Sequence, residues 1–307
     1  MPYAGEIAAL ATAVMWSFTS VFFSEAGRMI GSFNVNRIRL LMASLIYVVV
    51  LLVTTGRLFP ADLNGQQLFY LGLSGFIGLV LGDGCGFKAL VMIGPRLTTL
   101  LYSTAPIITT VIAWVFLGEQ LRFIELVGIG LTITGIAWVV TEREYKENGR
   151  PEVSGDHPDQ GSKFKGVLLG LGAATGQAVG LVLAKQGMLH AGGNVPPMEA
   201  SLIRMLVALV SIWLIAMLKG RLPLADMRNL RAMSFTFGGA FCGPFLGVWM
   251  SLVAVGLIET GIASTLNSTV PVMILPLLIL YYREKISLRA WLGAIVAVAG
   301  VALLFVS

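Results

Sequence analysis

Two stretches of this chain repeat each other at a constant distance, and this repeat limits the possible folds more than any other feature. The stretch from Pro95 to Glu119 recurs in diverged form from Thr260 to Glu284, with the same offset between all matching positions. Within the stretches Ser103 matches Ser268, Thr104 matches Thr269, Pro106 matches Pro271 and Glu119 matches Glu284. The same offset continues beyond them, where Gly128 matches Gly293 and Gly135 matches Gly300. Because these matches stay in register, they predict an internal duplication.

Each copy contains about 20 mostly apolar residues, which is long enough to cross a bilayer as a helix. The proline near its middle has no N–H, so it frees the carbonyl four residues back, which is that of Tyr102 or Asn267. Two equivalent broken helices beside polar side chains are typical of a transporter site. Kinked helices that only pack on their neighbours are the alternative. The candidate substrate-binding residues of the motif are Tyr102, Ser103, Pro106, Asn267, Ser268 and Pro271.

The composition points to a membrane protein. Hydrophobic residues make up 56% of the chain and charged residues 12%, against about 25% charged residues in a soluble domain. The net charge of +5 is therefore expected to reflect loop placement and not nucleic-acid binding. Cys85 and Cys242 fall inside apolar segments and are interpreted as packing residues, whereas His157 and His190 fall outside them. No metal-ligand spacing occurs, so neither a metal nor a cofactor is expected.

The predicted fold is an all-α membrane protein with ten transmembrane helices, arranged as two inverted five-helix repeats. The spans are expected at 5–25, 34–54, 68–90, 97–117, 124–141, 166–187, 198–218, 233–255, 261–281 and 289–306. A charged segment at 142–165, rich in proline and glycine, reads as a solvated linker between repeats at 1–141 and 166–307. Because five is odd, the second repeat enters the membrane from the opposite side, which requires inversion.

The loop charges predict the orientation. Two basic residues, Arg57 and Arg122, lie on the side of both termini, against fourteen on the side of the linker. The positive-inside rule then puts the linker in the cytoplasm and both termini outside, and a bacterial plasma (inner) membrane is expected.

Asp83 is the one acidic residue well inside a predicted span, where an unpaired charge is costly. It is a candidate for carrying a proton or for binding a cationic group of the substrate. A structural ion pair, with an arginine such as Arg39, is the alternative. Arg39 and Arg204 are equivalent in the repeat and lie one to two turns into the second and seventh spans. They are expected either to snorkel to the headgroups or to bind an anionic substrate.

Four further side chains are candidates for lining a cavity. Trp16 and Ser20 belong to a polar strip on the first span, and Gln177 lies near the middle of the sixth. Trp249 lies near mid-depth in the eighth span, away from the interfacial belt that tryptophan prefers. Core packing, or hydroxyls bonded back to their own helix, would explain the same residues. Glu119 and Glu284 are expected to cap or pin the loops that follow the repeated motif.

These features resemble the drug/metabolite transporter superfamily, in its EamA-type ten-helix branch. The resemblance rests on the five-plus-five pattern, the proline-centred helices, the segment Gly118-Glu119-Gln120-Leu121 and the glycines from Gly128 to Gly135. The second half departs from the pattern because Arg283 replaces the glycine before Glu284. The resemblance implies a secondary transporter, often an exporter of amino acids, other metabolites or drugs, with a central cavity between the halves.

The sequence therefore predicts a non-enzymatic secondary transporter that exports a small solute, as a monomer or homodimer, with protons as a possible coupling ion at Asp83. An intramembrane serine protease is one alternative, because Gly72-Leu73-Ser74-Gly75 has the GxSG form. That chemistry needs a histidine at membrane depth, and neither histidine falls inside a span. A channel or a non-transporting scaffold is the other alternative.

Overall fold

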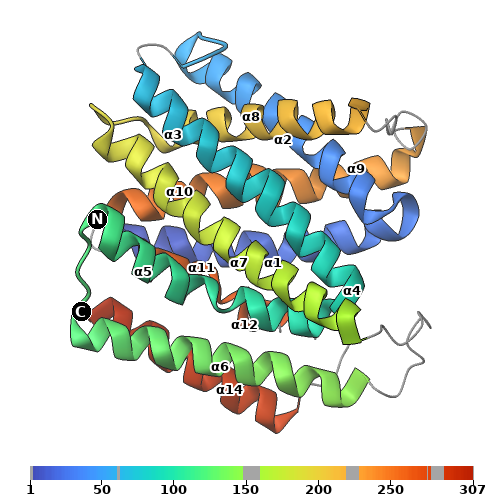
Figure 1. Cartoon of the computed structure of the whole chain (residues 1–307), viewed down its shortest axis with the longest axis vertical. Coiled ribbons are helices and arrows are strands. Elements are labelled where there is room, and N and C mark those ends of the chain that lie inside the picture. Colours follow the sequence, from blue (N-terminus) through green and yellow to red (C-terminus); the bar gives the residue numbers. More distant parts are fainter. Residues whose placement is uncertain are drawn as a thin grey trace.

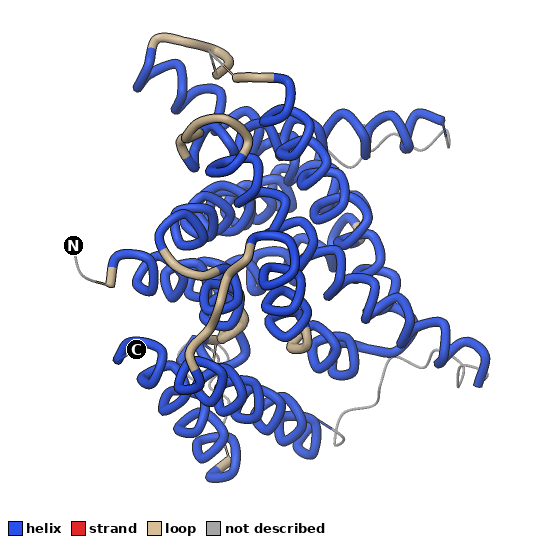
Figure 2. The backbone as a smooth tube through the Cα atoms, turned by 60° about the vertical axis from the view of Figure 1, so that its left-hand side comes forward, coloured by secondary structure: helices blue, strands red, loops and turns tan. Residues whose placement is uncertain are grey.

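The computed structural model describes residues 3–60, 63–147, 160–218, 228–274, 276–277 and 287–306, and all regular elements in these ranges are helices (Figures 1 and 2). The first half contains α1 (Ala4–Ile30), α2 (Ser32–Thr55), α3 (Gly65–Gly75), the π-helix η1 (Phe76–Gly82), α4 (Asp83–Tyr102), α5 (Ala105–Leu117) and α6 (Phe123–Glu147). The second half contains α7 (Gln160–Lys185), the π-helix η2 (Gln186–His190), α8 (Pro197–Leu218), α9 (Leu230–Ala240), the π-helix η4 (Phe241–Gly247), α10 (Val248–Leu257), α11 (Thr260–Asn267), α12 (Val270–Met273) and α14 (Leu288–Val306).

The duplication expected from the sequence is present in the elements themselves. The offset that places Pro106 on Pro271 also places the bounds of α3 and η1 on those of α9 and η4. Both helices begin at an asparagine: the side chain of Asn64 accepts a hydrogen bond from the Gln67 amide at 2.8 Å, and that of Asn229 accepts one from the Ala232 amide at 3.1 Å. An asparagine satisfies amides that a helix start leaves free. The same local signals therefore start the same helix in each half.

The paired helices α6 and α14 show how the two halves are related. A Cβ atom on Gly128 would lie 3.0 Å from the carbonyl oxygen of Gly300, and one on Gly135 would lie 2.6 Å from that of Gly293. Gly293 is the repeat equivalent of Gly128, and Gly300 is that of Gly135. Replacing each residue of the Gly128–Gly300 contact by its equivalent therefore gives the Gly135–Gly293 contact. Reciprocal contacts of this kind indicate a two-fold axis. The two equivalent helices run antiparallel, side by side in Figure 1.

The first helix of each half packs against the other half. On α1, Thr19 and Trp16 contact Gly243 and Gly247 of η4. On α7, glycines contact η1 in the corresponding way: Gly180 lies against Gly78, and Gly176 against Gly82. Small residues let membrane helices approach this closely. These contacts of α1 with η4 and of α7 with η1 join the two halves.

Six helical runs within the described residues are long and apolar enough to cross a membrane, and three shorter apolar helices lie at 105–117, 123–139 and 291–305. The predicted spans and the observed helices differ at the linker, in the ninth span, and between the third and fourth spans. Helices α6 and α7 extend into the segment predicted as linker, of which residues 148–159 lie outside the described ranges. The ninth predicted span is divided into α11 and α12, and residues 278–281 lie outside the described ranges.

The predicted loop at 91–96 falls within the bounds of α4. Cys85 contacts Gly172, whereas Leu101 contacts Gly170, only two residues away on α7. Sixteen residues of straight helix would separate Cys85 and Leu101 by about 24 Å. The chain therefore turns back between them, and in Figure 1 it descends through α3 and α4 and returns through α5. The expected change of direction is present, although the helical hydrogen bonding does not end there.

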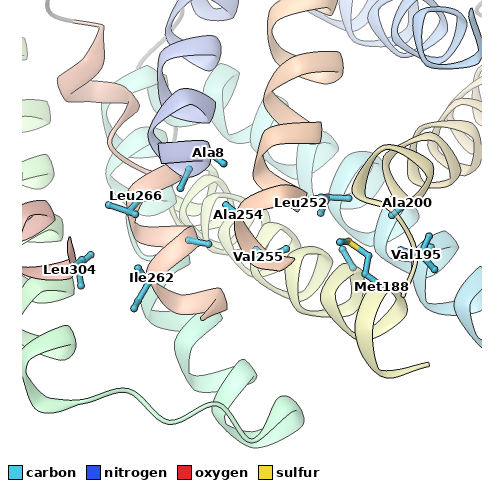
Figure 3. Close-up of a cluster of buried hydrophobic side chains, with 14 of the residues drawn as sticks. Ala8, Met188, Val195, Ala200, Leu252, Ala254, Val255, Ile262, Leu266 and Leu304 are labelled. Atoms are coloured by element: carbon cyan, nitrogen blue, oxygen red, sulfur yellow. The ribbon is translucent and has the colours of Figure 1, made fainter. Parts of the chain in front are cut away.

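The largest buried apolar cluster joins the halves at the end of the molecule that holds the termini. Figure 3 shows Met188 from η2 beside Leu252 and Val255 from α10, with Ile262 and Leu266 from α11 nearby. These side chains are fully or almost fully buried. They pack the end of α7 against α10 and α11.

Candidate functional site

The two helices with central prolines are interrupted at equivalent positions. Helix α4 ends at Tyr102 and α5 begins at Ala105, while α11 ends at Asn267 and α12 begins at Val270. In each gap a threonine hydroxyl donates back to a carbonyl, Thr104 to Leu101 at 2.6 Å and Thr269 to Leu266 at 2.7 Å. Each proline then stands in the first turn of the next helix, where its missing N–H is tolerated. The predicted pair of broken helices is present.

The polar side chains beside the breaks are arranged differently in the two copies. The side-chain amide of Asn267 donates to the hydroxyl of Ser251 at 2.9 Å. The side-chain oxygen Oδ1 of Asn267 is buried without a hydrogen-bond partner in the described residues. Tyr102 lies within electrostatic range of Asp83 and Arg39. Ser103 and Pro106 are buried. Ser268 donates to the carbonyl of Ser264, and Pro271 is half-buried.

Asp83 forms an ion pair with Arg39, from α4 to α2. The side chains are 12% and 4% exposed, so both charges are removed from most of the solvent. The Arg39 Nε also donates to the side-chain oxygen of Asn36 at 2.8 Å, and the guanidinium lies 5.7 Å from the ring centre of Phe23 and 5.8 Å from that of Phe87. The ion pair with Arg39 that the sequence analysis names is therefore present in the structure. The prediction that Arg39 snorkels to the headgroups is wrong, because a closer carboxylate is available inside the protein.

Arg204 is buried to the same extent as Arg39 but has a different environment. Its backbone packs on the first repeat, where a Cβ atom on Gly75 would come within 2.8 Å of the Arg204 Cα. Its guanidinium lies within electrostatic range of Tyr47 and Asp83. The Nε of Arg204 has no hydrogen-bond partner among the described residues. Snorkelling is wrong for this residue as well, since it is turned into the helix bundle.

The remaining candidates lie on α1, α7 and α10, and Trp16 and Trp249 pack against the same buried apolar cluster. The indole nitrogen of Trp16 lies 2.9 Å from where a Cβ atom on Gly247 would stand. The ring of Trp249 lies 6.1 Å from that of Phe245. Gln177 is half-buried on α7. Ser20 is exposed, and its hydroxyl bonds back to the Trp16 carbonyl at 2.9 Å, as the alternative for such hydroxyls anticipated. From the predicted set, Tyr102 and Arg204 each lie within electrostatic range of Asp83.

The two equivalent π-helices were not expected from the sequence. Pro244 lies inside η4, and the hydroxyl of Tyr47 donates to the carbonyl of Phe245 at 2.7 Å. π-Helices are rare and occur often at functional sites. Asp83 follows η1 directly, so the π-helix determines which way its carboxylate faces. The sequence signal that could have indicated these segments is the matching glycine clusters, together with a proline in one of them.

A second polar cluster was also missed, and it lies at the end of the molecule that holds the termini. The Glu119 carboxylate accepts from the Thr260 amide and hydroxyl at 2.7 Å each and pairs with Lys185 at 2.8 Å. Lys185 also donates to the Ile258 carbonyl at 2.7 Å. Glu119 was expected to pin its own loop, but it joins the first repeat to the second; Glu125 accepts from the Arg122 amide in that loop instead. Glu284 lies outside the described residues.

A cavity of about 280 Å³ lies next to this cluster and is lined by Glu119, Lys185, His190, Gly256 and Glu259, among others. The groups around it carry both signs of charge. Two polar sites among the described residues are therefore candidates, one at the Arg39–Asp83 pair and one at this end of the bundle.

The protease alternative finds no support in the geometry. Ser74 is fully buried, and its hydroxyl donates to the carbonyl of Gly180 at 2.5 Å. His190 lies ten residues beyond Gly180 along α7 and η2, which is about 15 Å of helix. His157 lies outside the described residues. The Gly72–Gly75 segment serves close packing of α3, against α8 through its two glycines and against α7 through Ser74.

Comparisons with known proteins agree with the architecture. The model of the EamA-like transporter family matches the chain twice, over residues 3–141 and 164–306. No curated protein matches the chain significantly. Among solved structures 29 chains match, and one, described only as the crystal structure of a protein, has a TM-score of 0.76 at 14% identity. That match covers 99% of this chain and 97% of the other, and at such low identity it shows the fold alone. Because the two family matches span nearly the whole chain, this protein belongs to the EamA-like transporter family of multi-pass membrane proteins.

Proposed function

We propose that the protein is a secondary-active transporter that exports a small metabolite, amino acid or drug-like solute by alternating access. The observation that carries this proposal is the pair of equivalent helix breaks at 103–104 and 268–269, related by an approximate two-fold axis. Freed backbone groups at membrane depth are tolerated where they line a cavity, and paired breaks are typical of transporter sites. The solute would bind between α1, α3–α4 and α5 of one half and α7, α9–α10 and α11–α12 of the other.

The proposed membrane arrangement has ten spans, with repeats at 1–141 and 166–307 and the linker at 142–165 in the cytoplasm. The excess of Lys and Arg on the linker side supports this orientation. We propose the bacterial plasma membrane as the location, and a monomer or homodimer as the working unit.

The cluster at Glu119 is suited to be the gate on the side of the termini. It ties α5 to α7 and to the start of α11 through one carboxylate, so that opening this side would break all three contacts together. Its partners are charged or carry hydroxyl groups, which water can solvate after they separate. Such a cluster can form and break at moderate cost, as a gate requires.

The Arg39–Asp83 pair is the proposed coupling site. A proton on Asp83 would remove the carboxylate charge and release the Arg39 guanidinium, so protonation and rearrangement of α2 against α4 would be linked. Asp83→Asn should therefore alter both the transport rate and its dependence on pH. Unchanged transport and pH dependence in proteoliposomes would remove Asp83 from this role.

Counterflow in proteoliposomes tests the transport proposal. Vesicles with purified protein are loaded with an unlabelled metabolite, and uptake of the same labelled metabolite against its gradient is measured across a panel of solutes. Saturable uptake that overshoots equilibrium supports a carrier. Flux that does not saturate and shows no counterflow would instead indicate a channel, and the absence of any flux would favour a scaffold.

A further inference from the structure

The two halves place an arginine at the same position but give it different partners. Arg39 and Arg204 occupy equivalent positions in the repeat, begin the matching segments Arg-Leu-Leu-Met-Ala and Arg-Met-Leu-Val-Ala, and are each 4% exposed. A guanidinium stays charged inside a protein, and an unpaired buried charge is costly. The surroundings of Arg39 therefore serve as a reference for what a buried arginine needs at this position.

Every group that stabilises Arg39 from α2 and α4 is lost at the equivalent position beside Arg204. In the register of the repeat, Asp83 becomes Val248, Asn36 becomes Ser201, and Phe87 becomes Leu252. The hydroxyl of Ser201 is occupied, since it donates to the Pro197 carbonyl at 2.8 Å. Val248 and Leu252 are buried. The second half has kept the cation and lost the carboxylate, the amide and a ring.

The first helices follow the same rule with a slightly different offset. Gly5 of α1 contacts Ile258, and Gly166 of α7 contacts Ile93. Because Ile93 and Ile258 are equivalent in the repeat, Gly5 is the equivalent of Gly166. In this register Phe23, whose ring faces Arg39, corresponds to Ala184. The second aromatic partner of Arg39 is therefore missing on the side of Arg204 as well.

The surroundings of Arg204 do not replace these partners. A Cβ atom on Gly78 would lie 3.6 Å from its Nη2, and its Nε is buried with no hydrogen-bond partner in the described part of the chain. Tyr47 and Asp83 lie within electrostatic range of its guanidinium. The hydroxyl of Tyr47 donates a hydrogen bond to the Phe245 carbonyl, and Asp83 is paired with Arg39. Two guanidinium groups and one carboxylate give this cluster a net charge of +1.

The residue that follows Asp83 also differs between the copies. A Cβ atom on Gly84 would meet no atom within 4 Å. The equivalent of Gly84 in the second half is Trp249. Asp83 itself keeps 12% of its side-chain exposure. The asymmetry thus leaves the cluster with an excess positive charge and with a carboxylate that is not fully covered.

We infer that the transported solute carries a single negative charge, as a carboxylate, and that this carboxylate binds Arg204. The inference rests on the proposed transport function and names the chemical class of its substrate. The carboxylate would supply to Arg204 what Asp83 supplies to Arg39, and the cluster would become neutral when loaded. A dianionic phosphate would leave it with a negative charge and should bind less well.

Matched pairs of solutes test the inference on the purified full-length protein. The probes are benzoate and benzamide, and hexanoate and hexanamide, with phenyl phosphate as the dianion, and the readout is the thermal unfolding temperature in detergent. At least one carboxylate should raise the unfolding temperature, while its neutral amide partner should not. Equal effects of acid and amide, or no effect of any carboxylate, would overturn the inference.

Two substitutions locate the effect at Arg204. Arg204→Gln should weaken the apparent affinity for the active carboxylate on the order of 100-fold, as expected when one partner of a buried charge pair is removed. Val248→Asp restores the carboxylate that the first half has, so it should stabilise the empty protein and abolish the response to carboxylates. Val248→Asn is the matched control, because it has the same shape without the charge and should not stabilise the protein. Carboxylate responses that persist in both Arg204→Gln and Val248→Asp would refute the assignment, and Val248→Asp decides alone if Arg204→Gln does not fold.

The counterflow measurement separates this inference from the proposed function. Saturable counterflow of neutral or cationic solutes, without carboxylates, would leave the carrier in place and refute the anion site. Carboxylate binding that depends on Arg204, without counterflow of any solute, would refute the carrier and retain the site.

Discussion

The contact between α6 and α14 allows a graded test of the packing argument. A Cβ atom on Gly135 would lie 2.6 Å from the Gly293 carbonyl oxygen and 2.7 Å from the Ala297 Cα, and still nearer to the Ala297 nitrogen. These are backbone atoms, which cannot rotate away. Since ordinary contacts begin at about 3.4 Å, Gly135→Ala forces the two helices apart by roughly 1 Å.

The magnitude follows from a comparison within one helix. A Cβ atom on Gly130, also in α6, would meet nothing within 4 Å. Gly130→Ala and Gly135→Ala gain the same helix propensity, about 0.5–1 kcal/mol, so their difference isolates the cost of overpacking. That cost is about 1–3 kcal/mol, and the upper end applies because only backbone can yield. Gly128→Ala should fall between them, since its nearest neighbour is the flexible Leu304 side chain at 2.8 Å.

Thermal unfolding of the three purified variants in detergent measures the order. For a chain of this size, about 3 kcal/mol corresponds to a decrease on the order of 5–10 °C in the unfolding temperature. Gly135→Ala should unfold lowest, Gly128→Ala next, and Gly130→Ala at or above the wild type. If Gly135→Ala proved as stable as Gly130→Ala, the close approach of α6 and α14 would be refuted.

Four further predictions concern the polar groups and the topology. Asp83→Asn leaves Arg39 buried without its carboxylate and should lower the free energy of unfolding by about 3–5 kcal/mol. The double variant with Arg39→Gln should lose less unfolding free energy than the sum of the two single variants, and strict additivity would argue against the pair. Tyr47→Phe removes the donor to the Phe245 carbonyl and should cost about 1–3 kcal/mol in the same assay, with no loss of stability as the contrary result. Glu119→Gln removes the charge paired with Lys185. A cysteine introduced at Gly256, in the cavity, should therefore react faster with a thiol reagent in the Glu119→Gln variant than in a protein that keeps Glu119; equal rates would exclude the gate. A cysteine introduced at Ser154, in a background without Cys85 and Cys242, should resist an impermeant reagent on whole cells, and labelling from outside would reverse the proposed orientation.

The regular features of the fold could be predicted from the sequence because they depend on local chemistry repeated twice. Pro106 and Pro271 predicted the helix breaks, since a missing N–H acts wherever it occurs. The family resemblance rested on the same positions, and the family match agrees with it. These signals need no knowledge of which helices touch.

The site could be predicted only in part, because its contacts join distant segments. The sequence marks Asp83 as a costly charge and Arg39 as a structural partner, but the burial of Arg39 depends on contacts with α4 and α1 that no periodicity predicts. Glu119 appeared to belong to its own loop, because its partners, Thr260 and Lys185, lie in the other half. The π-helices were missed because their hydrogen-bond pattern has no strong residue preference.

The π-helices have a consequence for how this chain can change. Each residue advances a helix by about 100°, so the number of residues in η1 sets the angle at which Asp83 leaves α4. Deleting one residue between Phe76 and Gly82 would turn the carboxylate away from Arg39 without altering either member of the pair. Insertions and deletions in this segment should therefore be far more harmful than substitutions. Related chains should keep the length of the segment more strictly than its residue types.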